Sequence, residues 1–124
     1  MLSILRLSPS DALVEARWDA FVSACPEATF FHRAGWQRLL RERLGHDTYY
    51  LYCEIDGHIE GVLPLAHVRS VLFGHSLVSL PFTVYGGVAA RTAPAAQALE
   101  REAQALARRL GVTHLELRNT QPRH

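Results

Sequence analysis

The stretch that decides the fold is residues 48–63, which read TYYLYCEIDGHIEGVL. Tyrosine and aliphatic residues on both sides of its centre favour extended strands. The Asp56-Gly57 pair between them is typical of a two-residue hairpin turn. The stretch therefore predicts an antiparallel hairpin near the middle of the chain.

The register of this hairpin follows from its turn. The uninterrupted ladder pairs Ile55 with His58, Tyr52 with Gly61, Leu51 with Val62 and Tyr50 with Leu63. One face then has Tyr49, Leu51, Cys53 and Val62, and the other has Tyr50, Tyr52, Ile59 and Leu63. Both faces are apolar, so we expect helices to cover both. Pro64 has no N–H for the ladder, and we expect a bulge or the end of pairing there.

Three helices are predicted around the hairpin. The first follows Ser8 or Ser10 as its cap, and its apolar stripe is Val14, Trp18, Phe21, Val22 and Cys25. The second covers residues 32–44, with buried positions Trp36, Leu39, Leu40 and Leu44. The third begins after Thr92, with Pro94 in its first turn, and Gly111 ends it. Its stripe is Ala96, Leu99, Ala103, Leu106 and Leu110.

Further strands are predicted at residues 2–7, 76–80 and 112–118, with a turn at Pro81 and a glycine-containing segment at 84–88. The order is β-α-α-β-β-β-α-β, without an internal repeat or a linker. We therefore expect one α/β domain over residues 1–124, with a mixed, mostly antiparallel sheet flanked by helices.

The composition excludes several classes of protein. The 124 residues are 48% apolar, and the net charge of +1 shows no nucleic-acid signature. All 13 basic residues are arginine, which excludes a P-loop, a Schiff-base lysine and a Ser–Lys dyad in this chain. The sequence has no signal-peptide pattern and no apolar run near the roughly 20 residues of a membrane span. We expect a cytoplasmic chain.

Few residues show the spacing of a metal or hydrolase site. The seven histidines form no His-x-His, HExxH or similar motif, and the best pair is His46 with His67, opposed in the predicted hairpin. We therefore expect no metal. No Gly-x-Ser-x-Gly elbow is present. Cys25 and Cys53 fit buried reduced thiols, and a nucleophilic Cys53 is the alternative.

Two segments are candidates for ligand contact. The glycines of Tyr85-Gly86-Gly87 favour either close approach of the backbone to a ligand or a simple turn. His32 and Arg33 lie at the predicted start of a helix, where an anion could be bound, and aromatic residues surround them.

Several motifs in this order resemble the GNAT acyltransferase superfamily and, within it, the FemAB-like transferases. They are residues 29–36 (TFFHRAGW), 56–65 (DGHIEGVLPL), 72–74 (LFG), 80–82 (LPF), 85–87 (YGG) and 115–118 (LELR). The combination is most similar to FemAB-related proteins associated with exosortase/PEP-CTERM systems. The array of helices and strands also resembles the first part of a GNAT fold, so the resemblance implies the N-terminal portion of a two-domain protein.

The resemblance implies transfer of an acyl or aminoacyl group to an amine in cell-envelope or exopolysaccharide biosynthesis. It places His32, Arg33 and Trp36 near the acceptor cleft, and Tyr85, Gly86 and Gly87 along it. The catalytic residue is not identified by the motifs. His32, His75 and Tyr85 are the candidates for the group that takes the proton. The partner is a small molecule or envelope precursor, and the family's donor is acyl-CoA or aminoacyl-tRNA.

One departure affects the donor. GNAT acetyltransferases hold coenzyme A with a loop of the form (Q/R)-x-x-G-x-(G/A), where this chain has Arg91-Thr92-Ala93-Pro94-Ala95-Ala96. Proline has no N–H for a phosphate, so we expect no coenzyme A cofactor in this chain. Two alternatives stay open. One is a non-catalytic substrate-binding or dimerisation module that pairs through an uncovered sheet edge. The other is a small coenzyme A-dependent N-acetyltransferase.

Overall fold

The computed structural model describes residues 1–8, 11–25, 28, 32, 34–42, 47–70, 74–79, 88–111 and 114–116, with the backbone alone for 68–70, 74–79 and 114–116. The strands are Leu2–Arg6 (β1), Asp47–Ile55 (β2), His58–Ser70 (β3), Gly74–Ser79 (β4), Ala89–Ala90 (β5) and His114–Glu116 (β6). The helices are Ala12–Ala24 (α1), Gly35–Glu42 (α2) and Ala93–Leu110 (α3). The short strand β5 was not predicted, and Pro81 and most of segment 84–88 lie outside the described residues.

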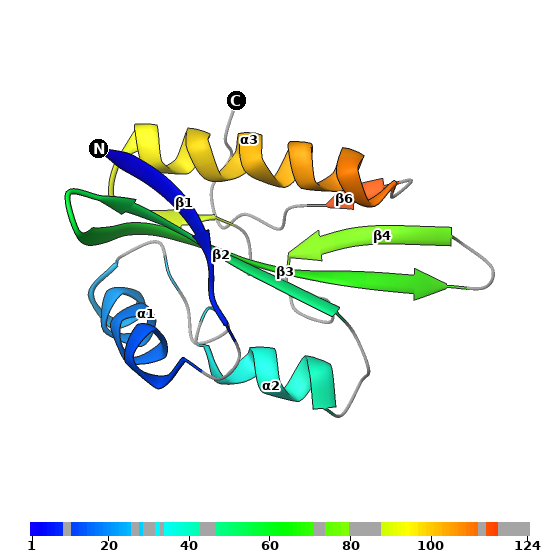
Figure 1. Ribbon diagram of the computed structural model, residues 1–124, viewed down its shortest axis with the longest axis horizontal. Helices are drawn as coiled ribbons and strands as arrows, with labels where there is room; N and C mark the ends of the chain where they lie inside the picture. The colour runs from blue at the N-terminus through cyan, green and yellow to red at the C-terminus, as the bar shows by residue number, and fades with distance from the viewer. Residues whose placement is uncertain are drawn as a thin grey trace.

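The strands form one mixed sheet in the order β1-β2-β3-β4-β6, and β5 also pairs with β3. The pairing is antiparallel everywhere except between β4 and β6, which are parallel. Helices α1 and α2 lie on one face of the sheet and α3 lies on the other (Figure 1). The predicted fold class is therefore confirmed. None of the helices described has the length and apolar content that a membrane crossing requires.

The hairpin turn between β2 and β3 is the one predicted. Asp56 and Gly57 have φ angles of 51° and 83°, the left-handed values that a type I′ turn requires at both central residues. Ile55 pairs with His58. The turn chemistry in the sequence therefore determines how this hairpin begins.

Beyond the turn, the predicted register is wrong by one residue. Glu54 pairs with Ile59, but the next pair joins Cys53 to Gly61, so Glu60 is an extra residue on β3. This is a β-bulge, and nothing in the local sequence requires it.

The bulge exchanges the faces of the following residues. Tyr52 pairs with Val62 and Leu51 pairs with Leu63, in place of the predicted partners. Val62 consequently joins the core on the α1 side, and Leu63 joins the core under α3. Side chains alternate along a strand, so a shift of one residue moves each of them to the opposite face.

Pro64 causes no bulge and does not end the pairing, contrary to prediction, because its place in the ladder needs no donor. It lies opposite Tyr50. The Tyr50 carbonyl accepts a hydrogen bond from the Leu7 N–H at 2.7 Å, on the β1 side of β2. Tyr50 and Pro64 therefore form a non-hydrogen-bonded pair of the β2–β3 ladder, which tolerates a proline.

Helix α1 is capped by Asp11 and by neither predicted serine. The Asp11 carboxylate accepts the Val14 N–H at 3.0 Å. An aspartate is as effective as a serine at the N-cap, so residue preference alone could not decide between Asp11 and the two serines. The predicted apolar stripe is confirmed: its members are buried, except for the half-buried Val14.

Helix α2 is shorter than predicted and buries different side chains. It begins at Gly35, while His32 lies before it. Leu40 is buried as predicted, but Trp36 is half-buried and Leu39 is 40% exposed. Gln37 is the other buried residue of this helix. Predicted Leu44 lies outside the described residues.

Helix α3 begins and ends as predicted. Thr92 is its N-cap, Pro94 lies in its first turn, and Gly111 ends it with a φ of 68°. Its predicted stripe faces the sheet, with Leu110 half-buried, and three more alanines of the helix are buried beside it: Ala95, Ala98 and Ala107. The capping signals and the 3.6-residue period were sufficient to define this element.

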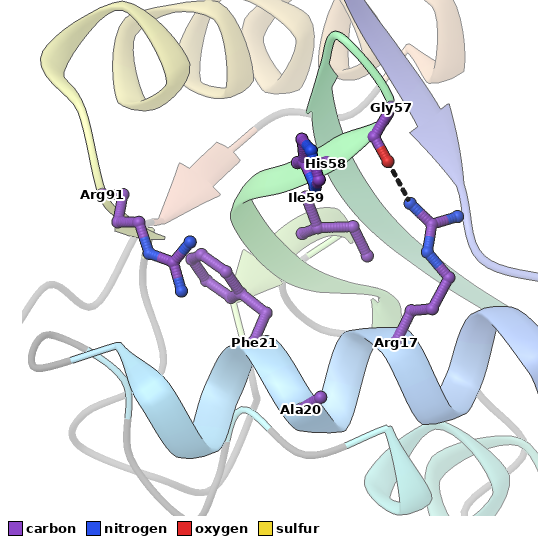
Figure 2. A pocket seen from close by; sticks show the side chains of 7 residues that line it. All are labelled: Arg17, Ala20, Phe21, Gly57, His58, Ile59 and Arg91. Atoms are coloured by element: carbon purple, nitrogen blue, oxygen red, sulfur yellow. Dashed lines mark hydrogen bonds between the residues drawn. The ribbon is translucent and has the colours of Figure 1, made fainter.

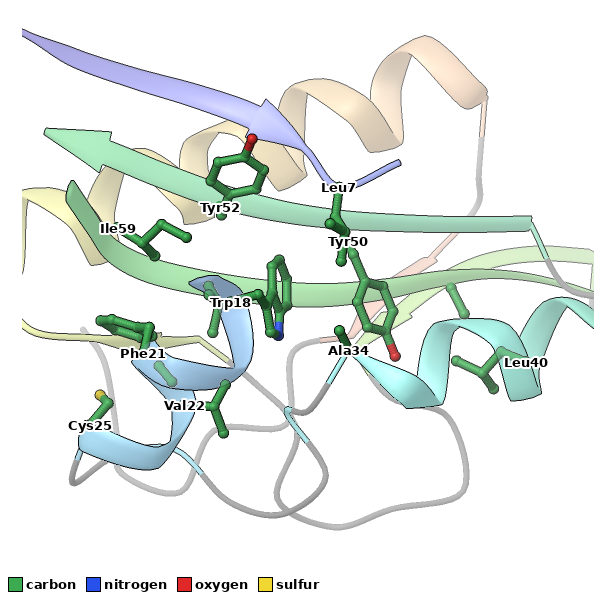
Figure 3. Close-up of a cluster of buried hydrophobic side chains, with 13 residues drawn as sticks. Leu7, Trp18, Phe21, Val22, Cys25, Ala34, Leu40, Tyr50, Tyr52 and Ile59 are labelled. Atoms are coloured by element: carbon green, nitrogen blue, oxygen red, sulfur yellow. The ribbon is translucent and has the colours of Figure 1, made fainter. Parts of the chain in front are cut away.

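Two hydrophobic clusters stabilise the fold, one on each face of the sheet. The cluster on the α1/α2 side includes Leu7, Trp18, Phe21, Val22, Cys25, Ala34, Leu40, Tyr50, Tyr52, Ile59, Val62, Ala66 and Ala89 (Figure 3). The cluster under α3 includes Leu51, Cys53, Leu63, Leu65, Val88, Ala90, Ala95, Ala96, Leu99, Ala103, Leu106 and Ala107.

Candidate functional site

Two of the predicted acceptor-site residues can be located, both on the α1/α2 side of the sheet. His32 is buried, and its main-chain carbonyl accepts the Trp18 indole N–H at 2.6 Å. Trp36 is half-buried against the cluster on this side. Arg33 and the segment 85–87 (Tyr85, Gly86 and Gly87) lie outside the described residues. Their contact with an acceptor stays a prediction.

The side chains of the other two candidate bases, His75 and Tyr85, are not described by the structure. His75 is on β4 opposite Arg69, and its side chain is not described. Tyr85 lies outside the described residues. The predicted opposition of His46 and His67 is wrong, because the bulge places Asp47 opposite His67. In the part of the chain that the structure describes, no three metal-ligating side chains gather.

Both cysteines are buried and unpaired, as predicted for core thiols. Burial raises the pKa of the Cys53 thiol, and the negative charge of Glu60 raises it further. A thiol with a raised pKa is protonated near neutral pH and is a poor nucleophile. The geometry therefore disfavours the alternative in which Cys53 attacks a substrate.

A set of polar contacts fixes α2 against the rest of this layer. The Asp19 carboxylate on α1 accepts the Ala34 N–H at 2.8 Å. The Gln37 side-chain amide donates to the Leu7 carbonyl at 3.2 Å and to the Thr48 hydroxyl at 3.0 Å. The burial of Gln37 was not predictable from the sequence, because a polar residue at a helix position gives no sign of burial until its partners are known.

The start of α3 has few free donors for an anion. The Arg91 N–H donates to the Glu60 carbonyl at 2.8 Å. Thr92 accepts the Ala95 N–H on its hydroxyl and the Ala96 N–H on its carbonyl. Pro94 has no N–H. Only the amides of residues 92 and 93 have no recorded bond within the described part of this loop. The residues present therefore fit a coenzyme A pyrophosphate poorly, because such a group needs several convergent N–H donors.

A pocket of about 270 Å³ lies beside this loop, on the α1 side (Figure 2). We call it the Arg17–Arg91 pocket, and it is lined by Arg17, Ala20, Phe21, Gly57, His58, Ile59 and Arg91. Helix α1 contributes three of these residues, because Ala20 and Phe21 follow Arg17 by three and four positions and so lie on the same side of the helix. The hairpin tip contributes three more. The last lining residue, Arg91, lies between β5 and α3.

Two arginines stand at the ends of this pocket. The Arg91 guanidinium lies over the Phe21 ring, 5.3 Å from its centroid, in cation–π geometry. Arg17 donates through Nη2 to a Glu54 carboxylate oxygen at 2.9 Å and to the Gly57 carbonyl at 3.2 Å. No motif in the sequence pointed to either arginine as part of a site.

Several solved acetyltransferase structures share the fold of this chain. A ribosomal-protein-alanine N-acetyltransferase from Brucella melitensis biovar Abortus 2308 is 18% identical, with a TM-score of 0.64, over 99% of this chain and 82% of that one. An aminoglycoside acetyltransferase from an uncultured soil metagenomic sample is 20% identical, with a TM-score of 0.66, over 98% and 82%. A GNAT family acetyltransferase from Staphylococcus aureus is 13% identical, with a TM-score of 0.64, over 99% and 93%.

No protein-family model and no curated protein sequence matches the chain. The structural likeness is therefore a likeness of fold, at identities too low to transfer a substrate. The chain has the fold of the GNAT acetyltransferases, in agreement with the broader part of the resemblance in its sequence.

Proposed function

We propose that this chain belongs to an acyltransferase that moves an acyl or aminoacyl group onto an amine. The observation that supports this is the GNAT acetyltransferase fold across 96–99% of the chain in the solved structures. The amine nitrogen would form a bond to the carbonyl carbon of an activated ester or thioester. The alcohol or thiol would then leave, and a base or water would take the proton of the amine.

The finer proposal is a FemAB-like role in cell-envelope or exopolysaccharide biosynthesis. Its support is the ordered set of motifs, among which residues 29–36 and 85–87 define the acceptor side. His32, His75 and Tyr85 are the candidates for the proton acceptor. The burial of His32 means that neighbouring groups must move before it contacts a substrate. The acceptor would be a small molecule or an envelope precursor.

For the donor we propose that this chain binds coenzyme A weakly, and that an aminoacyl ester is the better candidate. The support is the start of α3. Pro94 has no N–H there, and the N–H groups of Ala95 and Ala96 are already hydrogen-bonded to Thr92. Titration calorimetry with acetyl-CoA tests this directly. We expect no binding tighter than about 1 mM, equivalent to roughly 4 kcal/mol of binding free energy.

Two variants sharpen the test of the donor. Pro94→Gly restores one amide to the first turn and should strengthen acetyl-CoA binding measurably. The control Gln97→Gly places a glycine at an exposed position of the same helix and should leave the affinity unchanged. Micromolar affinity of the unmodified chain for acetyl-CoA would overturn the proposal and favour a small coenzyme A-dependent N-acetyltransferase.

A second candidate is a non-catalytic binding or dimerisation module. It is favoured by β1, which is an edge strand of the described sheet with Leu2 and Leu5 partly exposed. Analytical ultracentrifugation distinguishes the two candidates. A concentration-independent dimer without acyl transfer to any amine tested favours the module, and transfer of a labelled acyl or aminoacyl group favours the enzyme.

A further inference from the structure

The Arg17–Arg91 pocket has positive ends and an apolar floor. Its acidic neighbour Glu54 pairs with Arg17 but does not line it, and no carboxylate appears among the seven lining residues. Phe21 and Ile59 are both buried and form the floor between the two guanidinium groups (Figure 2). A concave site of this kind combines an apolar contact surface with a few charged donors, as small-molecule sites commonly do.

Arg91 is held in place and has no acidic partner among the residues that the structure describes. Its main-chain N–H is bound to the Glu60 carbonyl, and its guanidinium lies over Phe21. Within the described residues, no ion pair or side-chain hydrogen bond is recorded for it. A guanidinium whose position is fixed by an aromatic ring loses little conformational freedom when it binds a ligand.

Arg17 retains donors after its internal contacts are made. Both of its recorded hydrogen bonds start from Nη2, which reaches Glu54 and the Gly57 carbonyl. Arginine has five N–H donors, so those on Nε and Nη1 remain for another acceptor. The contacts with the hairpin tip fix the direction of this side chain.

A second pocket, of about 280 Å³, has a lining in which positive and negative charges balance. Its lining is Arg38, Arg41, Glu42 and Asp47, in which two positive charges face two negative ones. Arg38 is also paired with Glu15 on α1 at 2.9 Å. Such a surface has no net attraction for an anion. In the Arg17–Arg91 pocket, by contrast, the described lining residues include two arginines and no carboxylate, and the one acidic partner, Glu54 on Arg17, lies outside the lining.

We propose that the Arg17–Arg91 pocket binds a small ligand in which a carboxylate or phosphate is joined to an apolar or aromatic body. The oxyanion accepts hydrogen bonds from the guanidinium groups, and the body packs on Phe21 and Ile59. Charge-assisted hydrogen bonds from arginine are well suited to both oxyanions. The site is formed by α1, the hairpin tip and Arg91, and it does not depend on acyl transfer or on the predicted acceptor residues.

Titration calorimetry of the full chain with four probes tests this site: phenyl phosphate, benzoate, inorganic phosphate and benzyl alcohol. We expect one of the two aromatic anions to bind with submillimolar affinity, at least tenfold tighter than benzyl alcohol or inorganic phosphate. Preference for phenyl phosphate identifies a phosphate ligand, and preference for benzoate identifies a carboxylate ligand. Equal binding of benzyl alcohol, or no binding of either anion below about 10 mM, would overturn the proposal.

Variants connect this binding to the pocket. Arg91→Gln should weaken binding of the preferred anion by about 10- to 100-fold, the effect of losing charge-assisted hydrogen bonds. Arg17→Gln provides an independent second test, with a loss of at least fivefold. The control Arg101→Gln removes the same charge from an exposed position of α3 and should leave binding unchanged. An equal loss in the control would show nonspecific attraction and contradict the site.

Discussion

The two faces of the sheet are covered by layers of different chemistry. The α3 layer is packed from alanine and aliphatic side chains, and α3 approaches the sheet closely at Gly61. The α1/α2 layer is built around aromatic rings: Trp18 stacks on Tyr50 at 5.4 Å between centroids and meets Tyr52 edge-on at 6.3 Å. One layer is thus held by close packing of small groups, and the other by large rings.

The layers also differ in their buried polar groups. Three of the four buried polar residues in the described chain, His32, Gln37 and Thr48, lie in the α1/α2 layer. The fourth, His67, follows Ala66 on β3 and faces the α3 side. Hydrogen bonds have directional requirements, so they fix the orientation of α1 and α2 more narrowly than apolar packing does. The α1/α2 layer is therefore the one suited to position the proposed ligand-binding groups, and α3 chiefly stabilises the sheet.

The largest effect is expected from Trp18→Ala in the aromatic layer. This change removes a fully buried ring and leaves the His32 carbonyl without its indole donor. We expect a loss of about 3–5 kcal/mol in the free energy of unfolding, measured by urea denaturation followed by circular dichroism. The control Leu13→Ala, at an 82% exposed position of the same helix, should change stability by less than about 0.5 kcal/mol. A loss below about 1 kcal/mol for Trp18→Ala would contradict a rigid aromatic core.

A smaller effect is expected from Gly61→Ala in the α3 layer. A Cβ at this position would lie 2.9 Å from Leu99 Cδ1 and 3.2 Å from Ala90 Cβ. Overpacking of this kind should cost about 1–3 kcal/mol in the same denaturation experiment. At Gly35 an added Cβ meets nothing within 4 Å, so the control Gly35→Ala should be neutral or slightly stabilising. Equal stability of the two variants would show that the α3 layer is loosely packed.

The smallest effect is expected from Tyr50→Phe. The Tyr50 hydroxyl is buried and has no hydrogen-bond partner within the described part of the chain, so its removal should change stability near neutral pH by less than about 1 kcal/mol. A loss above about 2 kcal/mol would mean that the hydroxyl is hydrogen-bonded in solution.

The same variant has a distinct dependence on pH. Burial raises the pKa of Tyr50 far above its ordinary value, so the folded chain keeps this phenol neutral at alkaline pH. The unfolded chain ionises it above about pH 10. The stability that the neutral phenol contributes is therefore present below pH 10 and is lost as the pH rises above it. Tyr50→Phe should reduce this alkaline loss, as measured by denaturation at pH 9 and pH 11.

Much of the fold followed from local sequence signals. Asp56-Gly57 determined the turn, and Thr92 with Gly111 bounded α3, because capping and turn preferences depend on a few neighbouring residues. The bulge at Glu60 was not predictable in this way. It arises where β3 must match both β2 and the packing of two layers, and it decided the faces of Val62 and Leu63.

The Arg17–Arg91 pocket was not predicted, and contact of the predicted acceptor residues with a ligand stays a prediction. The motifs singled out His32 and Trp36, which lie in the α1/α2 layer but are not among the residues that line this pocket. They did not identify Arg17 or Arg91, which are distant in the chain and have no motif in common. Gln37 was missed for a related reason, since its burial depends on the Thr48 hydroxyl across the layer.

The sequence by itself determined the order of the helices and the main strands, the hairpin turn, the caps of α3 and the lack of an N–H at Pro94. These features depend on the covalent structure of each residue and on contacts within one turn or one strand. Tertiary structure alone decided the register beyond the turn, the burial of Gln37 and the placement of Arg17 and Arg91 at one pocket. These features depend on packing between distant segments, and a local pattern does not encode which segments will meet.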